Sequence, residues 1–107
     1  MKQEDGSAKL ASFRNDWEKV IEDSFEKYNL PEYMIAGTKA YILYGLLRPG
    51  CFLYHLMSCD FVEICRTADK ENSKKLHQWG AFLYCSVPTA CYGSEEKIKR
   101  WRKTHSK

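Results

Sequence analysis

The apolar window from Ala40 to Met57 constrains the fold most, because Arg48, Pro49 and Gly50 interrupt it near its centre. Without the interruption, the window would be about as long as a membrane-spanning helix. Proline and glycine together favour a turn, since proline fixes one backbone angle and glycine tolerates conformations that other residues avoid. We therefore predict two core helices joined by a turn, as a central helical hairpin, and no membrane span.

Single polar residues recur between apolar blocks through the wider stretch from Tyr41 to Asn72. They are Arg48, His55, Asp60, Arg66, Asp69 and Asn72. Polar side chains placed in this way are typical of a helical hairpin with a polar seam. We expect this stretch to form the core of an all-α domain.

A chain of 107 residues is long enough for one domain with a single core. The first nine residues, MKQEDGSAK, lack the apolar segment of a secretory signal. The five cysteines include no C-x-x-C pair, which favours a reducing compartment. We therefore expect a single domain over residues 1–107, located in the cytoplasm.

The segment 8–29 is predicted to form one long amphipathic helix, because apolar residues such as Phe13 and Trp17 recur at intervals of three and four. Ser7 is a suitable N-cap, and Pro31 requires an end before it. The opposite face is charged; it contains Arg14, Glu18, Lys19, Glu22, Asp23, Glu26 and Lys27. Residues 1–7 and 103–107 are expected to fray.

The rest of the chain contains signals for further helices but none for a strand. We predict a second helix from Pro31 to Gly45 and a third over 52–57. A fourth is capped by Ser58 or Asp60 and contains Phe61, Val62, Ile64 and Cys65. A fifth covers 69–86, and a last one begins at Ser94 and is anchored by Ile98 and Trp101. The pattern leaves open whether 50–66 is one bent helix or two. The predicted fold is a compact all-α bundle of about five or six helices, with its core in 41–101.

Sites for catalysis or metal binding are weakly represented. Cys51, His55 and Cys59 are spaced by four residues, but buried core thiols are the commoner use of such cysteines. Asp60 and Glu63 are one turn apart, an arrangement more often used for helix caps and surface pairs than for acid–base catalysis. No glycine-rich phosphate loop is present. We predict no catalytic residues, no metal and no cofactor.

Aromatic residues near a few cations favour a ligand-binding function. Rings can stack on a nucleotide-like small molecule while arginine binds its phosphate by charge-assisted hydrogen bonds. The candidate ligand-binding residues are Tyr44, Arg48, His55, Asp60, Arg66, Asp69 and Asn72. A tyrosine-rich core or a protein–protein surface would produce a similar pattern.

Nucleic-acid binding is the alternative function. Bases outnumber acids in 70–107, and the basic residues around Trp101 suit phosphate contact with stacking. The candidate residues are Lys97, Lys99, Arg100, Arg102 and Lys103. Trp101 also pairs with Ile98, which favours a purely structural role for this ring.

A recurring order of residues extends from Tyr41 to Trp101. It comprises Pro49-Gly50-x-Phe52-Leu53, Leu56-x-Ser58-x-Asp60-Phe61, Ala68-Asp69-x-x-Asn72, Pro88, Gly93-Ser94 and Trp101. This order resembles a group of small helical proteins of unassigned activity, encoded by bacteriophages, prophages and mobile elements. That group has Asn-Asp where this chain has Cys59-Asp60, so any site using the Asn is altered here.

The resemblance implies a cytoplasmic accessory protein that acts by binding, and it leaves the first helix as an extension. Such a protein would counter host defence by sequestering a nucleotide-like signal or by occluding a host defence protein. The first helix is also long enough to build a homo-oligomer.

Overall fold

The computed structural model describes residues 5–105, and these residues form helices and no strands. The elements are α1 (Asp5–Lys27), the 3-10 turn η1 (Glu32–Met34), α2 (Ile35–Tyr44), α3 (Phe52–Ser58), α4 (Phe61–Thr67), α5 (Lys70–Lys74), α6 (Leu76–Ser86), the 3-10 turn η2 (Thr89–Cys91) and α7 (Glu95–His105). The predicted all-α fold is therefore confirmed, with seven α-helices in 5–105 where five or six were expected. Within the same residues no helix is long and apolar enough to cross a membrane.

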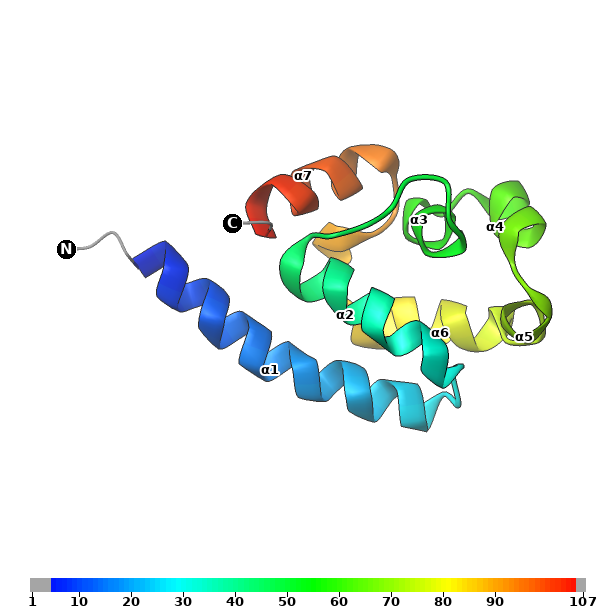
Figure 1. Ribbon diagram of the computed structural model, residues 1–107, viewed down its shortest axis with the longest axis horizontal. Helices are drawn as coiled ribbons and strands as arrows, with labels where there is room; N and C mark the ends of the chain where they lie inside the picture. The colour runs from blue at the N-terminus through cyan, green and yellow to red at the C-terminus, as the bar shows by residue number, and fades with distance from the viewer. Residues whose placement is uncertain (1–4, 106–107) are drawn as a thin grey trace.

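The helices surround α2, which contacts α1 on one side and α7 on the other. In Figure 1, α1 runs along one edge of the molecule, α6 lies behind α2, and α3, α4 and α7 form the opposite edge. The N-terminal part of α1 projects past the body, which gives the molecule extents of 50 × 27 × 20 Å.

The core is built around Trp79, whose side chain is fully buried. Its ring meets the rings of Phe25, Phe52 and Phe82 edge to face, with centroids 5.6 to 5.9 Å apart. The indole Nε1 donates a hydrogen bond of 2.9 Å to Oδ1 of buried Asn72. A polar atom that folding removes from water is thus paired, as burial requires.

The helix predicted over 8–29 is present as α1, and its apolar stripe includes the buried Ile21 and Phe25. The helix ends at Lys27, and Asn29 adopts a left-handed conformation at φ 54° before Pro31. Ser7 is not an N-cap, because the chain is already helical at Asp5. Residues 5–7 belong to the helix, and the fraying predicted for 1–4 lies outside the described residues.

Arg14, on the charged face of α1, forms hydrogen bonds to two other helices. Its Nε donates to the carbonyl of Leu43 at 2.8 Å, and its Nη2 donates to the carbonyl of His105 at 3.0 Å. Its guanidinium also lies 4.4 Å from the ring centroid of Tyr44. Arg14 therefore joins α1 to the C-terminal ends of α2 and α7, where free carbonyls and the helix dipole favour a cation.

The predicted turn at Arg48–Gly50 is present between two core helices, α2 and α3. Gly45 ends α2 in a left-handed conformation at φ 69°, and Gly50 has φ 83° within the turn. Gly37 and Thr38 do not break α2, because the Thr38 hydroxyl bonds to the carbonyl of Met34 one turn earlier.

The segment 50–66 forms two helices. Cys59 ends α3 in the left-handed conformation at φ 61°, and Asp60 takes the N-cap position of α4 without a side-chain capping bond. Phe61 and Val62 are 72% and 68% exposed, although their apolar character suggested burial. The reason is that α4 packs mainly on α3, so these two side chains have no neighbouring helix to cover them.

The helix predicted over 69–86 is divided at Lys75 into α5 and α6. The predicted last helix is present, and its N-terminal cap is confirmed, since Oγ of Ser94 accepts a hydrogen bond from the Lys97 amide at 3.2 Å. The predicted anchors Ile98 and Trp101 are buried. The helix continues to buried His105, while 106–107, also predicted to fray, lie outside the described residues.

Candidate functional site

A groove of about 430 Å³ lies where the start of α2, the α2–α3 linker and the α4–α5 turn meet. Its walls are Tyr33, Met34, Gly37, Leu46, Leu47, Arg48, Cys51, Phe52, Leu53, Thr67, Asp69 and Asn72. Three of the seven predicted ligand-binding residues, Arg48, Asp69 and Asn72, therefore line one cavity. The turn at Pro49-Gly50 brings Arg48 to it, and the N-terminus of α5 brings Asp69 and Asn72.

The groove combines an apolar floor with an exposed rim. Leu47, Phe52 and Leu53 are buried beneath it. At the rim, the side chains of Tyr33 and Leu46 are 59% and 60% exposed. A ring or an aliphatic group entering from solvent would meet carbon atoms on both the floor and the rim.

Asp69 is held by hydrogen bonds within the groove wall. Its Oδ1 accepts from the amide of Asn72 at 2.8 Å, which caps α5, and its Oδ2 accepts from the hydroxyl of Tyr33. The Tyr33 bond, followed by the Asn72 amide, lowers the pKa of Asp69, and the same carboxylate raises the pKa of Tyr33 to about 12. Asp69 thus caps α5, and Asn72 pairs with Trp79 in the core.

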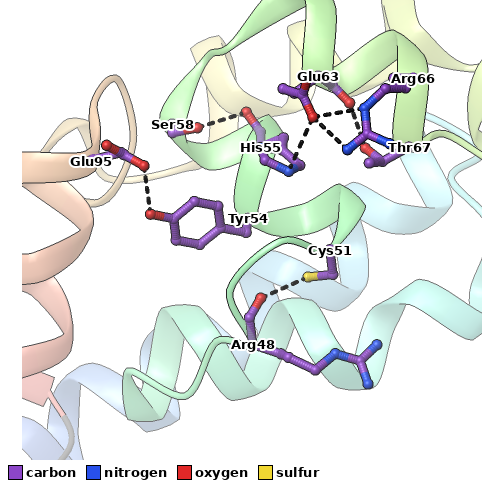
Figure 2. A network of polar contacts seen from close by, with 9 residues as sticks. All are labelled: Arg48, Cys51, Tyr54, His55, Ser58, Glu63, Arg66, Thr67 and Glu95. Atoms are coloured by element: carbon purple, nitrogen blue, oxygen red, sulfur yellow. Dashed lines mark hydrogen bonds and ion pairs between the residues drawn. The ribbon is translucent and has the colours of Figure 1, made fainter.

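Arg48 is the one cation among the residues that line the groove. Its side chain is exposed, and its guanidinium makes no hydrogen bond or ion pair with residues 5–105. Its backbone carbonyl accepts from the Cys51 thiol at 3.1 Å. Figure 2 shows the side chain extending away from the cluster that contains His55 and Arg66.

His55 and Arg66 belong to a separate surface cluster with Glu63, shown in Figure 2. Oε1 of Glu63 accepts from Nε and Nη2 of Arg66 at 2.9 and 2.6 Å and lies 3.8 Å from Nε2 of His55. The Arg66 bonds lower the pKa of Glu63, and the Glu63 carboxylate raises the pKa of Arg66. The Glu63–Arg66 pair lies within α4, and the His55–Glu63 contact joins α4 to α3. These residues do not line the groove.

The two remaining predicted residues also lie elsewhere. Tyr44 packs against Arg14 at the end of α2, and Asp60 is exposed at the start of α4. Tyr33 and Leu46 were not among the predicted ligand-binding residues. The sequence did contain a signal for Tyr33, because it is an aromatic residue at a helix start, close behind Pro31, that does not belong to an apolar stripe facing the core.

The cysteines do not form a reactive or metal-binding centre among residues 5–105. Cys91 is buried, and burial raises the pKa of its thiol to about 12, which disfavours the thiolate. Burial also raises the pKa of Cys59. In the described part of the chain no group of three His, Cys, Asp or Glu residues is placed to hold a metal ion.

The basic residues of α7 divide between two shallow hollows. Lys99, Arg102 and Lys103 line one of about 350 Å³ with Gly45 and Leu46. Lys97 and Arg100 line another of about 340 Å³, whose walls also include Ala90, Trp101, Thr104 and His105. The five candidate cations therefore do not form one continuous strip.

Trp101 does not serve as an exposed stacking ring. It is 7% exposed, its Nε1 donates to the Ile42 carbonyl at 3.2 Å, and its ring stacks on His105 at 3.8 Å. This ring anchors α7 to the core, in agreement with the structural role that its pairing with Ile98 suggested.

Comparison with family models, curated proteins and solved structures gave no significant match. The chemistry of the groove is therefore the basis for a functional assignment.

Proposed function

We propose that this protein is a non-enzymatic binding protein that sequesters a nucleotide-like small molecule in the groove between α2 and the α4–α5 turn. The observation that carries the proposal is that Arg48, whose guanidinium forms no ion pair with residues 5–105, is the one cation among the residues lining a largely apolar cavity. Following the resemblance to phage and mobile-element proteins, the molecule bound is a signal of host defence, and the site of action is the host cytoplasm.

The groove residues suit the parts of a nucleotide. A guanidinium binds phosphate oxygens through two parallel hydrogen bonds. The exposed ring of Tyr33 and the apolar floor offer surfaces for a base or a sugar. The volume of about 430 Å³ falls within the range of small-molecule sites, roughly 300 to 1,000 Å³.

The same groove offers little for catalysis, which supports a binding role. Asp69 is ionised and held by two hydrogen bonds, so it is a poor general acid near neutral pH. His55, the residue best suited to proton transfer, lies beside Glu63 outside the groove. A ligand placed here would be held rather than converted.

Thermal unfolding with 5′-AMP and with adenosine tests the proposal, because the two ligands differ only in the phosphate. Wild-type protein is expected to gain more stability from AMP than from adenosine, and Arg48→Ala is expected to abolish that difference. Arg66→Ala is the matched control, since it removes an exposed arginine that does not line the groove. Equal stabilisation by AMP and adenosine would refute the proposal. No stabilisation by either ligand, or by the corresponding guanine compounds, would refute it as well.

Occlusion of a host protein is the competing mechanism, and the exposed rim residues Tyr33 and Leu46 are compatible with it. Native mass spectrometry of protein purified gently from phage-infected cells separates the two. A retained mass of several hundred daltons that is lost on denaturation supports sequestration. A retained polypeptide supports occlusion instead.

A further inference from the structure

Leu46 lies on the border between the groove and the basic hollow of α7. It lines both cavities, and its side chain is 60% exposed between them. The two depressions are therefore neighbours on one surface, with Arg48 on one side of Leu46 and the cations of α7 on the other. In Figure 1 the linker that carries these residues passes between α2 and α7 toward α3.

The basic hollow has a concentrated positive charge. Lys99 and Lys103 are one turn apart on α7, and Arg102 follows Lys99 by three residues, so all three share a face. None of the three forms an ion pair with a carboxylate among residues 5–105. Three like charges on one helix face repel one another, and a bound anion would relieve that repulsion.

Compensation of the helix dipole explains only part of this arrangement. Arg102 and Lys103 lie in the last turn of α7, where cations are favoured by the helix itself. Lys99 lies a turn earlier, where that effect has largely faded. Its presence in the same hollow indicates a surface suited to an external anion.

We infer that the ligand is a nucleotide with at least two phosphate groups, such as a dinucleotide, which crosses Leu46 with one phosphate at Arg48 and another at the basic hollow. This inference rests on the proposed function. The exposed Leu46 side chain would contact the sugar or base between the two phosphates. The groove and the basic hollow adjoin at Leu46, so one ligand could reach both.

The test compares the dissociation constants of 5′-AMP and the linear dinucleotide 5′-pApA at low salt. Wild-type protein is expected to bind pApA about tenfold more tightly than AMP, with a steeper salt dependence. Lys99→Ala/Lys103→Ala is expected to remove this gain, so that pApA and AMP bind about equally. The matched variant Lys97→Ala/Arg100→Ala removes two charges from the other hollow and is expected to retain it.

The failures of the two proposals are distinguishable. If AMP binds through Arg48 but pApA binds no more tightly, the two-phosphate inference is overturned and the proposed function stands. If neither ligand binds, both are overturned. If a ten-nucleotide RNA binds far more tightly than pApA and both α7 variants weaken it equally, the surface is a general nucleic-acid interface and the inference is overturned.

Discussion

Arg14 contacts the ends of two helices that lie far from it in the sequence. Its partners, the carbonyls of Leu43 and His105, are the orphan acceptors that every helix leaves at its C-terminus. The spacing of apolar residues assigned Arg14 to the polar side of α1, because that spacing distinguishes only polar from apolar positions. Which polar residue meets a neighbouring helix depends on how the helices pack, and a local pattern does not contain that information.

Arg14→Ala is expected to destabilise the protein by about 2 to 3 kcal/mol, because it removes two charged hydrogen bonds and leaves carbonyls unpaired. Arg14→Lys should recover only part of this loss, since an ammonium lacks the forked geometry that serves both acceptors. Urea unfolding measures the change. Lys19→Ala, whose side chain is 81% exposed on the same helix, is the control and should change stability by less than about 1 kcal/mol. Equal losses in both variants would contradict this role.

Cys59 occupies a left-handed backbone position at φ 61°, which glycine and asparagine tolerate best. The sequence pattern led us to expect Asn at this position, and the left-handed conformation would suit that residue. Cys59 does not line the groove, so the difference concerns the end of α3 and not the candidate site.

Cys59→Asn and Cys59→Gly are expected to stabilise the fold by about 0.5 to 1 kcal/mol through relief of the left-handed strain. Chemical denaturation measures the gain. Cys65→Asn is the comparison, because Cys65 is also exposed but lies within α4, where asparagine is a weaker helix former. A gain at residue 65 that matches the gain at residue 59 would exclude the conformational explanation.

At the scale of elements, the α4–α5 turn depends on Asp69. Its lowered pKa means that the folded state favours the ionised form. The contribution of Asp69 to stability is complete above its pKa in the unfolded chain, near 4. This contribution is lost as the pH falls through its lower pKa in the folded state. The hydrogen bond from Tyr33 is lost at high pH instead. Tyr33 has a pKa of about 12 in the folded state and near 10 in the unfolded state, so the contribution of this bond to stability is complete below about pH 10 and is lost as the pH rises toward 12.

Asp69→Ala is expected to cost about 1 kcal/mol from the lost cap and to flatten the stability profile below pH 4. Tyr33→Phe should leave the cap intact and flatten the profile between pH 10 and 12. Thermal unfolding across pH measures both effects. Because the two residues interact directly, the double variant should cost less than the sum of the single ones. If the double variant lost as much stability as the two single variants together, the hydrogen bond between Tyr33 and Asp69 would be contradicted.

The docking of α7 on α1 depends on a neutral His105. This residue is buried, stacks on Trp101, and has an Nδ1 that finds no hydrogen-bond partner among residues 5–105. Burial, together with the nearby Arg14 charge, lowers the pKa of His105. As the pH falls, His105 therefore gains a proton more readily in the unfolded chain than in the folded one. The free energy of unfolding decreases as the pH drops below about 6.5.

His105→Phe is expected to reduce the loss of stability between pH 7 and pH 5, because an uncharged ring can occupy the same contact with Phe13 and Trp101. Thermal unfolding at the two pH values measures the difference. His77→Phe is the control, since His77 is exposed on α6. An unchanged pH profile in His105→Phe would show that another group titrates.

For the whole molecule, the features predicted correctly from sequence are those determined by a few neighbouring residues. Gly45 ends α2 and Ser94 caps α7 through local backbone chemistry. The division at Lys75, the exposure of Phe61 and the burial of His105 depend on contacts between distant segments. The same distinction applies to the groove, where Arg48, Asp69 and Asn72 were identified but the neighbours that enclose them were not.

The bond between Arg14 and the His105 carbonyl spans 91 residues, which has a consequence for the order in which the protein can assemble on the ribosome. α1 is synthesised well before α7, so one of the two carbonyls that Arg14 contacts is made much later than Arg14 itself. During translation, α1 therefore lacks the support of α7, and its half nearest the N-terminus exposes Phe13. The contact can form only after α7 has been synthesised, so a late segment of the chain secures an earlier helix.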